Sequence, residues 1–128
     1  MNPRYYAHAA LLLFVAGVIA VEVAGAVPGR QQGFAAAYRV GAMERVSRKR
    51  GLPVVGCMVA SPHEPIGRWL TVASRRGQRR CRVTDVCHPR DCAAIRRRGI
   101  VVELDAGSNA ALCPRNEPPR ACRVEVWR

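Results

Sequence analysis

The second half of the chain is organised as short runs in which hydrophobic and polar positions alternate, separated by turn residues. Arg80–Val86 and Ala121–Trp127 alternate with a period of two, which is typical of strands with one buried face. Shorter apolar runs predict further strands at Phe34–Tyr38, Pro53–Val59, Trp69–Ala73 and Ile100–Leu104. Several short strands separated by turns indicate a small β-barrel.

Helical signals interrupt this pattern in three places. Met43 and Val46 share one face of the first predicted helix, and Gly51 ends it. Asp91 stands near the N-cap of the second, and Ser108 is a cap residue for the third. The predicted helices are Ala42–Arg50, Asp91–Arg98 and Ser108–Cys113. We therefore expect a mainly β fold with one to three short helices.

The first 26 residues have a different character. Arg4 precedes an apolar run from Ala9 to Val21, and Ala24–Ala26 fits an A-x-A cleavage site. This is the tripartite pattern of a secretory signal peptide. The apolar run approaches the ~20 residues that span a bilayer, so an uncleaved signal anchor is the alternative. We expect a linker at 27–34 and a single domain at 35–128.

Charge narrows the choice of partner. The chain has 21 basic and 9 acidic residues, a net charge of +12, and Arg4 and Glu22 cancel within the signal segment. The exported part therefore carries the whole charge, and such a field attracts polyanions. Export disfavours nucleic acid and favours an anionic cell-wall polymer, with membrane contact only through the first segment. The dense basic run Arg45–Arg50 is either a solvated helix face or a patch for this partner. The sequence leaves the oligomeric state open.

Six cysteines lie beyond the signal segment, at positions 57, 81, 87, 92, 113 and 122. An even number in an oxidising compartment predicts three disulfides, with 15 possible connectivities. Cys87 and Cys92 could close a local loop, while Cys81 with Cys122, and then Cys57 with Cys113, is one hypothesis for the rest. Zinc binding through Cys87-His88 and Cys92 lacks a second ligand pair at the usual spacing. We expect neither a metal nor another cofactor.

Four segments resemble, in order and spacing, the rare-lipoprotein-A-like double-psi β-barrel. That family reads approximately G-T-x-L-x-V, V-x-V-N-D-R-G-P, G-R-x-I-D-L-S and V-x-V-E-V. The matching segments are Gly67–Val72, Cys81–Asp85, Arg98–Asp105 and Cys122–Val126. Weaker similarity places Ala36–Tyr38 on the first strand and, with a gap, Met58–His63 on an M-T-A-A-H segment. The resemblance implies a six-stranded double-psi barrel, as in expansins and barwin-like proteins.

The resemblance also implies candidate site residues. Catalytic members cleave peptidoglycan by lytic transglycosylation, with the Asp of the V-N-D segment as acid/base, and the matching residue is Asp85. His63 would assist it, and Glu103 would be a second carboxylate. Val86–Pro89 replaces the family's R-G-P, so Asp85 could instead only tie down a psi-loop. Tyr38 and Trp69 are candidates for stacking on sugar rings, against ordinary packing.

Three functions follow as hypotheses. The first is a secreted, periplasmic or envelope barrel that binds or remodels peptidoglycan at the bacterial cell wall. The second is a peptidoglycan lytic transglycosylase with Asp85 as its acid/base. The third is a secreted barwin- or expansin-like effector module without catalysis.

Overall fold

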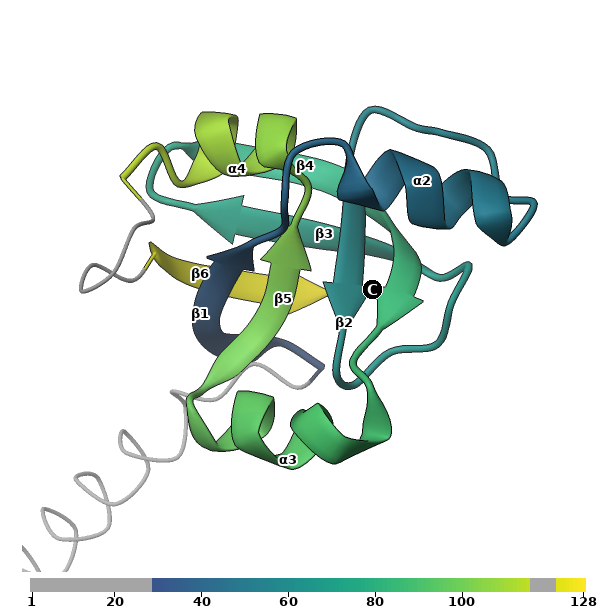
Figure 1. The fold of residues 1–128 in the computed structure, drawn as a ribbon. Coiled ribbons are helices and arrows are strands. Elements are labelled where there is room, and N and C mark those ends of the chain that lie inside the picture. Colours follow the sequence, from purple (N-terminus) through teal and green to yellow (C-terminus); the bar gives the residue numbers. More distant parts are fainter. Residues whose placement is uncertain (1–28, 116–121) are drawn as a thin grey trace, which may run out of the picture.

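The computed structural model describes residues 29–115 and 122–128. Within these residues the chain forms six strands and three short helices (Figure 1). The strands are β1 (Gln31–Ala37), β2 (Met58–Ser61), β3 (Trp69–Ser74), β4 (Gly77–Val86), β5 (Ile100–Leu104) and β6 (Cys122–Trp127). The helices are α2 (Ala42–Lys49), α3 (Pro89–Arg97) and α4 (Ala106–Leu112).

The signal peptide or anchor expected over residues 1–26 lies outside the described residues. Across the described ranges, no helix is long and apolar enough to cross a membrane.

The strands close into a barrel in the order β1-β5-β2-β4-β3-β6. The pairs β1/β5 and β2/β4 are parallel, and the other described pairs are antiparallel. A parallel pair cannot be joined by a tight turn, so long connections cross the ends of the barrel. Figure 1 shows α2 and α4 at one end of the barrel and α3 at the other. The expectation of a mainly β, six-stranded double-psi barrel with short helices is confirmed.

Aliphatic side chains fill the barrel, as a chain with only 5% aromatic residues requires. The aliphatic residues of this core with 1% exposure or less are Val59, Leu70, Val72, Val83, Val102 and Leu104. A second cluster lies outside the barrel, where Met43 of α2 packs on Met58 and Ala60 of β2. Burial of a methionine side chain contributes about 1.5–3 kcal/mol, which holds α2 against the strand.

Each parallel pair contains a β-bulge. Between β2 and β4, Val59 pairs with Val83 but the next residue, Ala60, pairs with Asp85. Thr84 is the additional residue, and it is buried like Val83. A bulge redirects the side chains that follow it. Without it, strict alternation would place Asp85 on the same inward face as Val83; with it, Asp85 lies on the outer face.

The disulfides are Cys57–Cys81, Cys87–Cys92 and Cys113–Cys122, and they account for all the cysteines. The local Cys87–Cys92 bridge is confirmed. The pairings of Cys81 with Cys122 and of Cys57 with Cys113 are wrong. The barrel order explains why, because β3 separates β4 from β6, whereas β2 and β4 are neighbours. Cys57 immediately precedes β2 and therefore lies beside Cys81 of β4.

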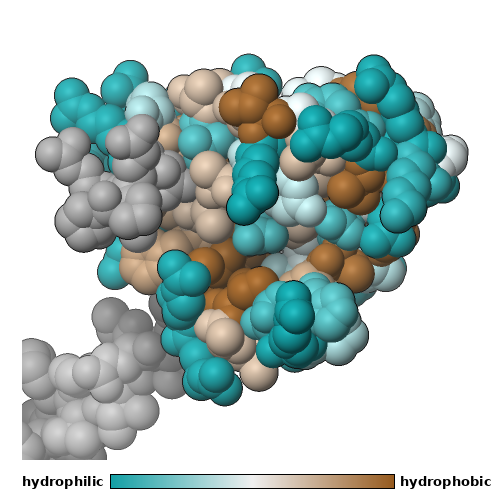
Figure 2. All heavy atoms as spheres, in the orientation of Figure 1, coloured by the Kyte–Doolittle hydropathy of each residue, from teal (hydrophilic) through white to brown (hydrophobic). Residues whose placement is uncertain are grey.

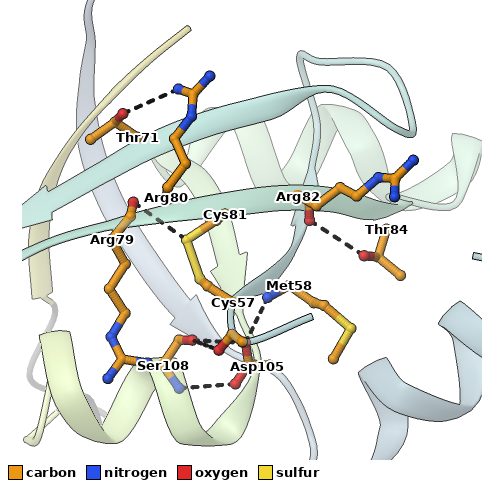
Figure 3. The surroundings of a disulfide bond; sticks show 11 residues. Cys57, Met58, Thr71, Arg79, Arg80, Cys81, Arg82, Thr84, Asp105 and Ser108 are labelled. Carbon is orange, nitrogen blue, oxygen red and sulfur yellow. Dashed lines mark hydrogen bonds between the residues drawn. A yellow bond between two sulfur atoms is a disulfide. The ribbon is translucent and has the colours of Figure 1, made fainter. Parts of the chain in front are cut away.

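Asp105 fastens α4 next to the Cys57–Cys81 disulfide (Figure 3). Its carboxylate accepts hydrogen bonds from the backbone N–H groups of Met58 (2.8 Å) and Ser108 (2.9 Å), and from the Ser108 hydroxyl (2.8 Å). Asp105 is thus the N-cap of α4, which corrects the prediction of Ser108 as the cap. The buried carboxylate has a structural role, since its acceptor positions are used within the fold.

Two predicted boundaries, of a strand and of a helix, also need correction. The strand predicted at Pro53–Val59 starts only at Met58. The residues before it form a turn after α2, where the buried Ser47 hydroxyl lies within hydrogen-bond distance of the carbonyls of residues 52 and 53. Helix α3 begins at Pro89 with His88 as its N-cap, two residues before Asp91. Proline is favoured at the first helical position, where its missing N–H has no intrahelical partner to lose.

Strand β1 begins at Gln31, within the segment expected as a linker. Residues 31–33 pair with 124–126 of β6, so the pairing extends the strand. Gly33 permits this close approach, since a Cβ there would lie 2.5 Å from the Gly99 carbonyl oxygen and 2.6 Å from a Val101 methyl.

Candidate functional site

Outward-facing residues form a row across four neighbouring strands of the barrel. Ala36 pairs with Glu103, Glu103 with Ala60, and Ala60 with Asp85. Directly paired residues project to the same face, so both carboxylates lie on the outer side of the barrel, with the buried Ala60 between them. Two strand spacings separate their backbones, roughly 10 Å. In Figure 1 this surface faces the viewer between α2 above and α3 below.

Tyr38 and Arg50 hold the Asp85 carboxylate from two directions. The Tyr38 hydroxyl donates to Oδ2 at 2.7 Å, and Nη2 of Arg50 lies 2.7 Å from Oδ1. Tyr38 directly follows β1, and its backbone N–H donates to the Leu104 carbonyl at 2.8 Å. Arg50 is the C-cap of α2. The site therefore joins the ends of β1, β4 and α2.

These partners determine the charge state of Asp85. Burial alone would raise its pKa, but hydrogen bonds from Tyr38, Arg50 and the Val86 backbone together hold the pKa below its ordinary value. Burial, together with the hydrogen bond to Asp85, raises the pKa of Tyr38 to about 12. At neutral pH the pair is consequently a carboxylate and a protonated phenol.

Glu103 has the opposite environment. Burial raises the pKa of its carboxyl, the Asp85 charge raises it further, and Arg98 partly offsets both. Two carboxyl groups on one surface thus have pKa values moved in opposite directions. In enzymes that use two carboxyl groups, such a separation of pKa values lets one group act as the proton donor while the other stays ionised.

Trp69 lies on β3 opposite Arg82 of β4, at the edge of the same surface. The guanidinium carbon of Arg82 is 5.9 Å from the centre of the indole ring, within the range of a cation–π contact. Arg82 Nε has no hydrogen-bond partner among the described residues. Trp69 is 39% exposed. This exposure leaves part of the ring open to a ligand.

The structure gives the other predicted site residues different positions. Tyr38 packs against the cluster of Met43, Met58 and Ala60, and its hydroxyl is bound to Asp85, so it acts as a hydrogen-bond donor. His63 lies in the exposed loop after β2, where its backbone N–H donates to Ser61 Oγ. Partial burial lowers the pKa of its imidazole, and so does the nearby Arg96.

Arg50 belongs to the candidate site through its contact with Asp85, although the sequence analysis treated it only as part of a basic run. The sequence feature that could have indicated Arg50 is its position at the end of α2, because residues at helix ends often contact neighbouring elements. Only the packing of α2 over β2 brings it to Asp85. Within the described ranges, no three side chains of His, Cys, Asp or Glu come together as a metal site.

Similarity to known proteins is found at the level of structure. No family model matches the sequence, and no curated protein matches it. The structure is similar to the crystal structure of an apo expansin from Clavibacter michiganensis, with a TM-score of 0.46 and 18% identity. The match covers 76% of this chain and 48% of that chain, so this chain spans about half the length of the expansin. The fold assignment therefore rests on the strand order and register described above.

The disulfides indicate the kind of cellular compartment in which the protein is found. Three bridges in a small barrel fit a secreted or envelope protein, because thiols stay reduced in most cytosols.

Proposed function

We propose that this protein is an exported barrel that binds a cell-wall glycan, peptidoglycan, on the outer face between α2 and α3. The observation that carries the proposal is the ionised Asp85, held by Tyr38 and Arg50 beside the partly buried Glu103. Carboxylates orient sugar hydroxyls by accepting their hydrogen bonds, and a few such polar groups define a ligand's position.

The surroundings supply the other contacts that this ligand needs. Peptidoglycan carries carboxylates on its peptides, and Arg50 and Arg98 place guanidinium groups at the two sides of the acidic pair. Trp69, which is 39% exposed beside Arg82, offers an indole ring for contact with a sugar. Acidic, basic and aromatic groups thus lie within one surface.

Sedimentation with purified insoluble peptidoglycan tests the binding. Asp85→Asn combined with Glu103→Gln should weaken retention roughly tenfold or more, since both hydroxyl acceptors lose their charge. Asp91→Asn combined with Glu125→Gln is the matched control, because it removes two carboxylates outside the row. Equal retention of all three proteins would contradict the proposed site.

A second candidate function is lytic transglycosylation, and the opposed pKa shifts of Glu103 and Asp85 favour it. Glu103 would protonate the glycosidic oxygen as the bond to the anomeric carbon breaks. The 6-hydroxyl of the same sugar would attack that carbon and return its proton to Glu103, with Asp85 stabilising the positive charge. No water is consumed, and the products are an anhydro-sugar end and a shortened glycan. This assigns the acid/base to Glu103 rather than to Asp85.

Mass spectrometry of purified glycan strands after incubation distinguishes the candidates. Anhydro products that disappear in Glu103→Gln would support the enzyme. Retention on the wall without products would leave the binding module. Neither retention nor products would favour the third hypothesis, a secreted effector module.

A further inference from the structure

A groove lined by arginines lies on another part of the barrel. Phe34, Ser74, Leu112 and the Cys113–Cys122 bridge form its floor and walls. Among its described lining residues there is no carboxylate. The basic residues that line it, here called the arginine groove, are Arg75 and Arg76 of the β3–β4 turn, Arg115 after α4, and Arg123 of β6.

The turn that carries Arg75 and Arg76 is held in place. Strands β3 and β4 pair up to Ser74 and Gly77, at the two sides of the turn. The Ser74 hydroxyl donates to the Leu112 carbonyl at 2.6 Å and accepts from the Arg76 backbone N–H at 3.1 Å. The turn is therefore attached to the end of α4. A rigid backbone lowers the entropic cost of binding at this surface.

Among the described residues, no carboxylate forms an ion pair with an arginine of the groove. Within the described part of the chain, the ion pairs involve other arginines, and Arg75, Arg76 and Arg115 are exposed. Exposed Arg79 and Arg80 add charge along β4. Like charges gathered without counter-charges repel one another, and a bound polyanion relieves this repulsion.

The type of cation points to the type of anion. Of the chain's 21 basic residues, 20 are arginine. A guanidinium group binds phosphate or carboxylate oxygens through two parallel hydrogen bonds, which lysine cannot do. Arg123 is already oriented, because its guanidinium carbon lies 5.6 Å from the centre of the Phe34 ring.

The groove is separate from the acidic row. Arg76 precedes β4 and Asp85 lies near the end of β4, nine residues further along the chain, which corresponds to about 30 Å in an extended strand. In Figure 1 the β3–β4 turn lies at the left, and the end of β4 lies at the right. Figure 2 shows hydrophilic side chains gathered at the upper left, where the turn lies.

We propose that the arginine groove binds a linear, phosphodiester-linked polyol polymer of the cell envelope. Nucleic acid is the other phosphodiester polymer to consider. Three disulfides favour a compartment without it. Nucleic-acid bases also bind by stacking on exposed aromatic rings. Among the described groove residues Phe34 is the one aromatic residue, and the Arg123 guanidinium already lies over its ring, which disfavours stacking of a base there.

Calorimetric titration of the purified full chain with synthetic poly(glycerol phosphate) tests this proposal. The triple variant Arg75→Gln, Arg76→Gln, Arg115→Gln should bind roughly tenfold more weakly near physiological salt, with a shallower salt dependence. The matched control Arg39→Gln, Arg90→Gln, Arg97→Gln removes the same charge from exposed positions elsewhere. It should keep the affinity within about twofold.

Two results would overturn the proposal. An equal loss in both triple variants would show that net charge alone drives binding. A single-stranded oligonucleotide of equal charge that binds as tightly as poly(glycerol phosphate) would make nucleic acid the partner. Retention on peptidoglycan stripped of phosphate polymers should stay unchanged in the groove variant, which separates this proposal from the glycan site. If the triple variant does not fold, the double variant Arg75→Gln, Arg76→Gln replaces it.

Discussion

The Tyr38 hydroxyl donates a 2.7 Å hydrogen bond to the Asp85 carboxylate, across 47 positions of sequence. The contact joins the residue after β1 to the end of the pairing between β2 and β4, where Asp85 pairs with Ala60. It contributes to the raised pKa of Tyr38, beside burial, and to the lowered pKa of Asp85, beside Arg50 and the Val86 backbone. One hydrogen bond therefore couples the structure of the barrel to the charge of its candidate site.

Tyr38→Phe should make the protein less sensitive to acid. The folded-state pKa of Asp85 lies below its ordinary value of about 3.9, so its ionised form adds stability above that pH, and this stability is lost as pH falls through the folded pKa. Removal of the hydroxyl should raise that pKa and cost about 0.5–1.5 kcal/mol at neutral pH. Urea unfolding at several pH values measures both effects. An unchanged pH profile would contradict the role of this bond.

Asp85→Asn should lower the pKa of Glu103. Burial is the main cause of the raised Glu103 pKa, so a raised value should persist, but the repulsion from Asp85 would be gone. A raised folded-state pKa gives stability that is complete below the unfolded pKa and is lost as pH rises through the folded pKa. Carboxyl NMR titration of Glu103 checks the shift. Asp91→Asn, as the control, should leave the titration unchanged.

Replacing both cysteines of a bridge by alanine should cost more at Cys57–Cys81 than at Cys87–Cys92. The sequence separations are 24 and 5, and a longer closed loop restricts the unfolded chain more. Loop entropy gives losses of about 3.5 and about 2 kcal/mol. Urea unfolding of the two double variants measures this order. Peptide mapping under non-reducing conditions should first recover the three pairings, and any other pairing would contradict the structure.

Gly33→Ala should destabilise the barrel by about 1–3 kcal/mol. The new Cβ would lie 2.5 Å from a backbone carbonyl oxygen of the β5 side, and backbone cannot move aside without breaking pairs. Gly56→Ala is the matched control, because a Cβ there meets nothing within 4 Å. Equal melting temperatures of the two variants would show that β1 does not pack as closely as described.

The exported form should begin at Val27 if the A-x-A site is cleaved. N-terminal sequencing or intact mass of the protein recovered outside the cytoplasm measures this directly. A mass that retains residues 1–26 would establish the signal anchor instead.

The sequence predicted most of β4 and of β6 because period-two alternation reports burial directly, and it predicted β5 from a continuous apolar run. It predicted the strand before Met58 wrongly, since the same apolar residues can pack as a turn under α2. It also placed the cap of α3 at Asp91 rather than His88. Such local signals do not say which of several adjacent polar residues meets the free N–H groups.

The sequence identified two carboxylates of the candidate site, but it did not show which residues surround them. Asp85 and Glu103 were found through the family resemblance, and Arg50 was found only in the structure. Alternation alone would have turned Asp85 toward the core beside Val83, and the bulge at Thr84 turned it outward. A bulge depends on the partner strand, which local sequence does not identify.

The sequence by itself determined the strand segments, the aliphatic core, the positive charge and the need for disulfides. These properties depend on composition and on neighbours a few residues apart. Tertiary structure decided the strand order, and with it which cysteines meet and which charges surround Asp85. The reason is physical: two residues become partners through strand pairing across the barrel, and that pairing minimises the free energy of the whole chain rather than of any one segment.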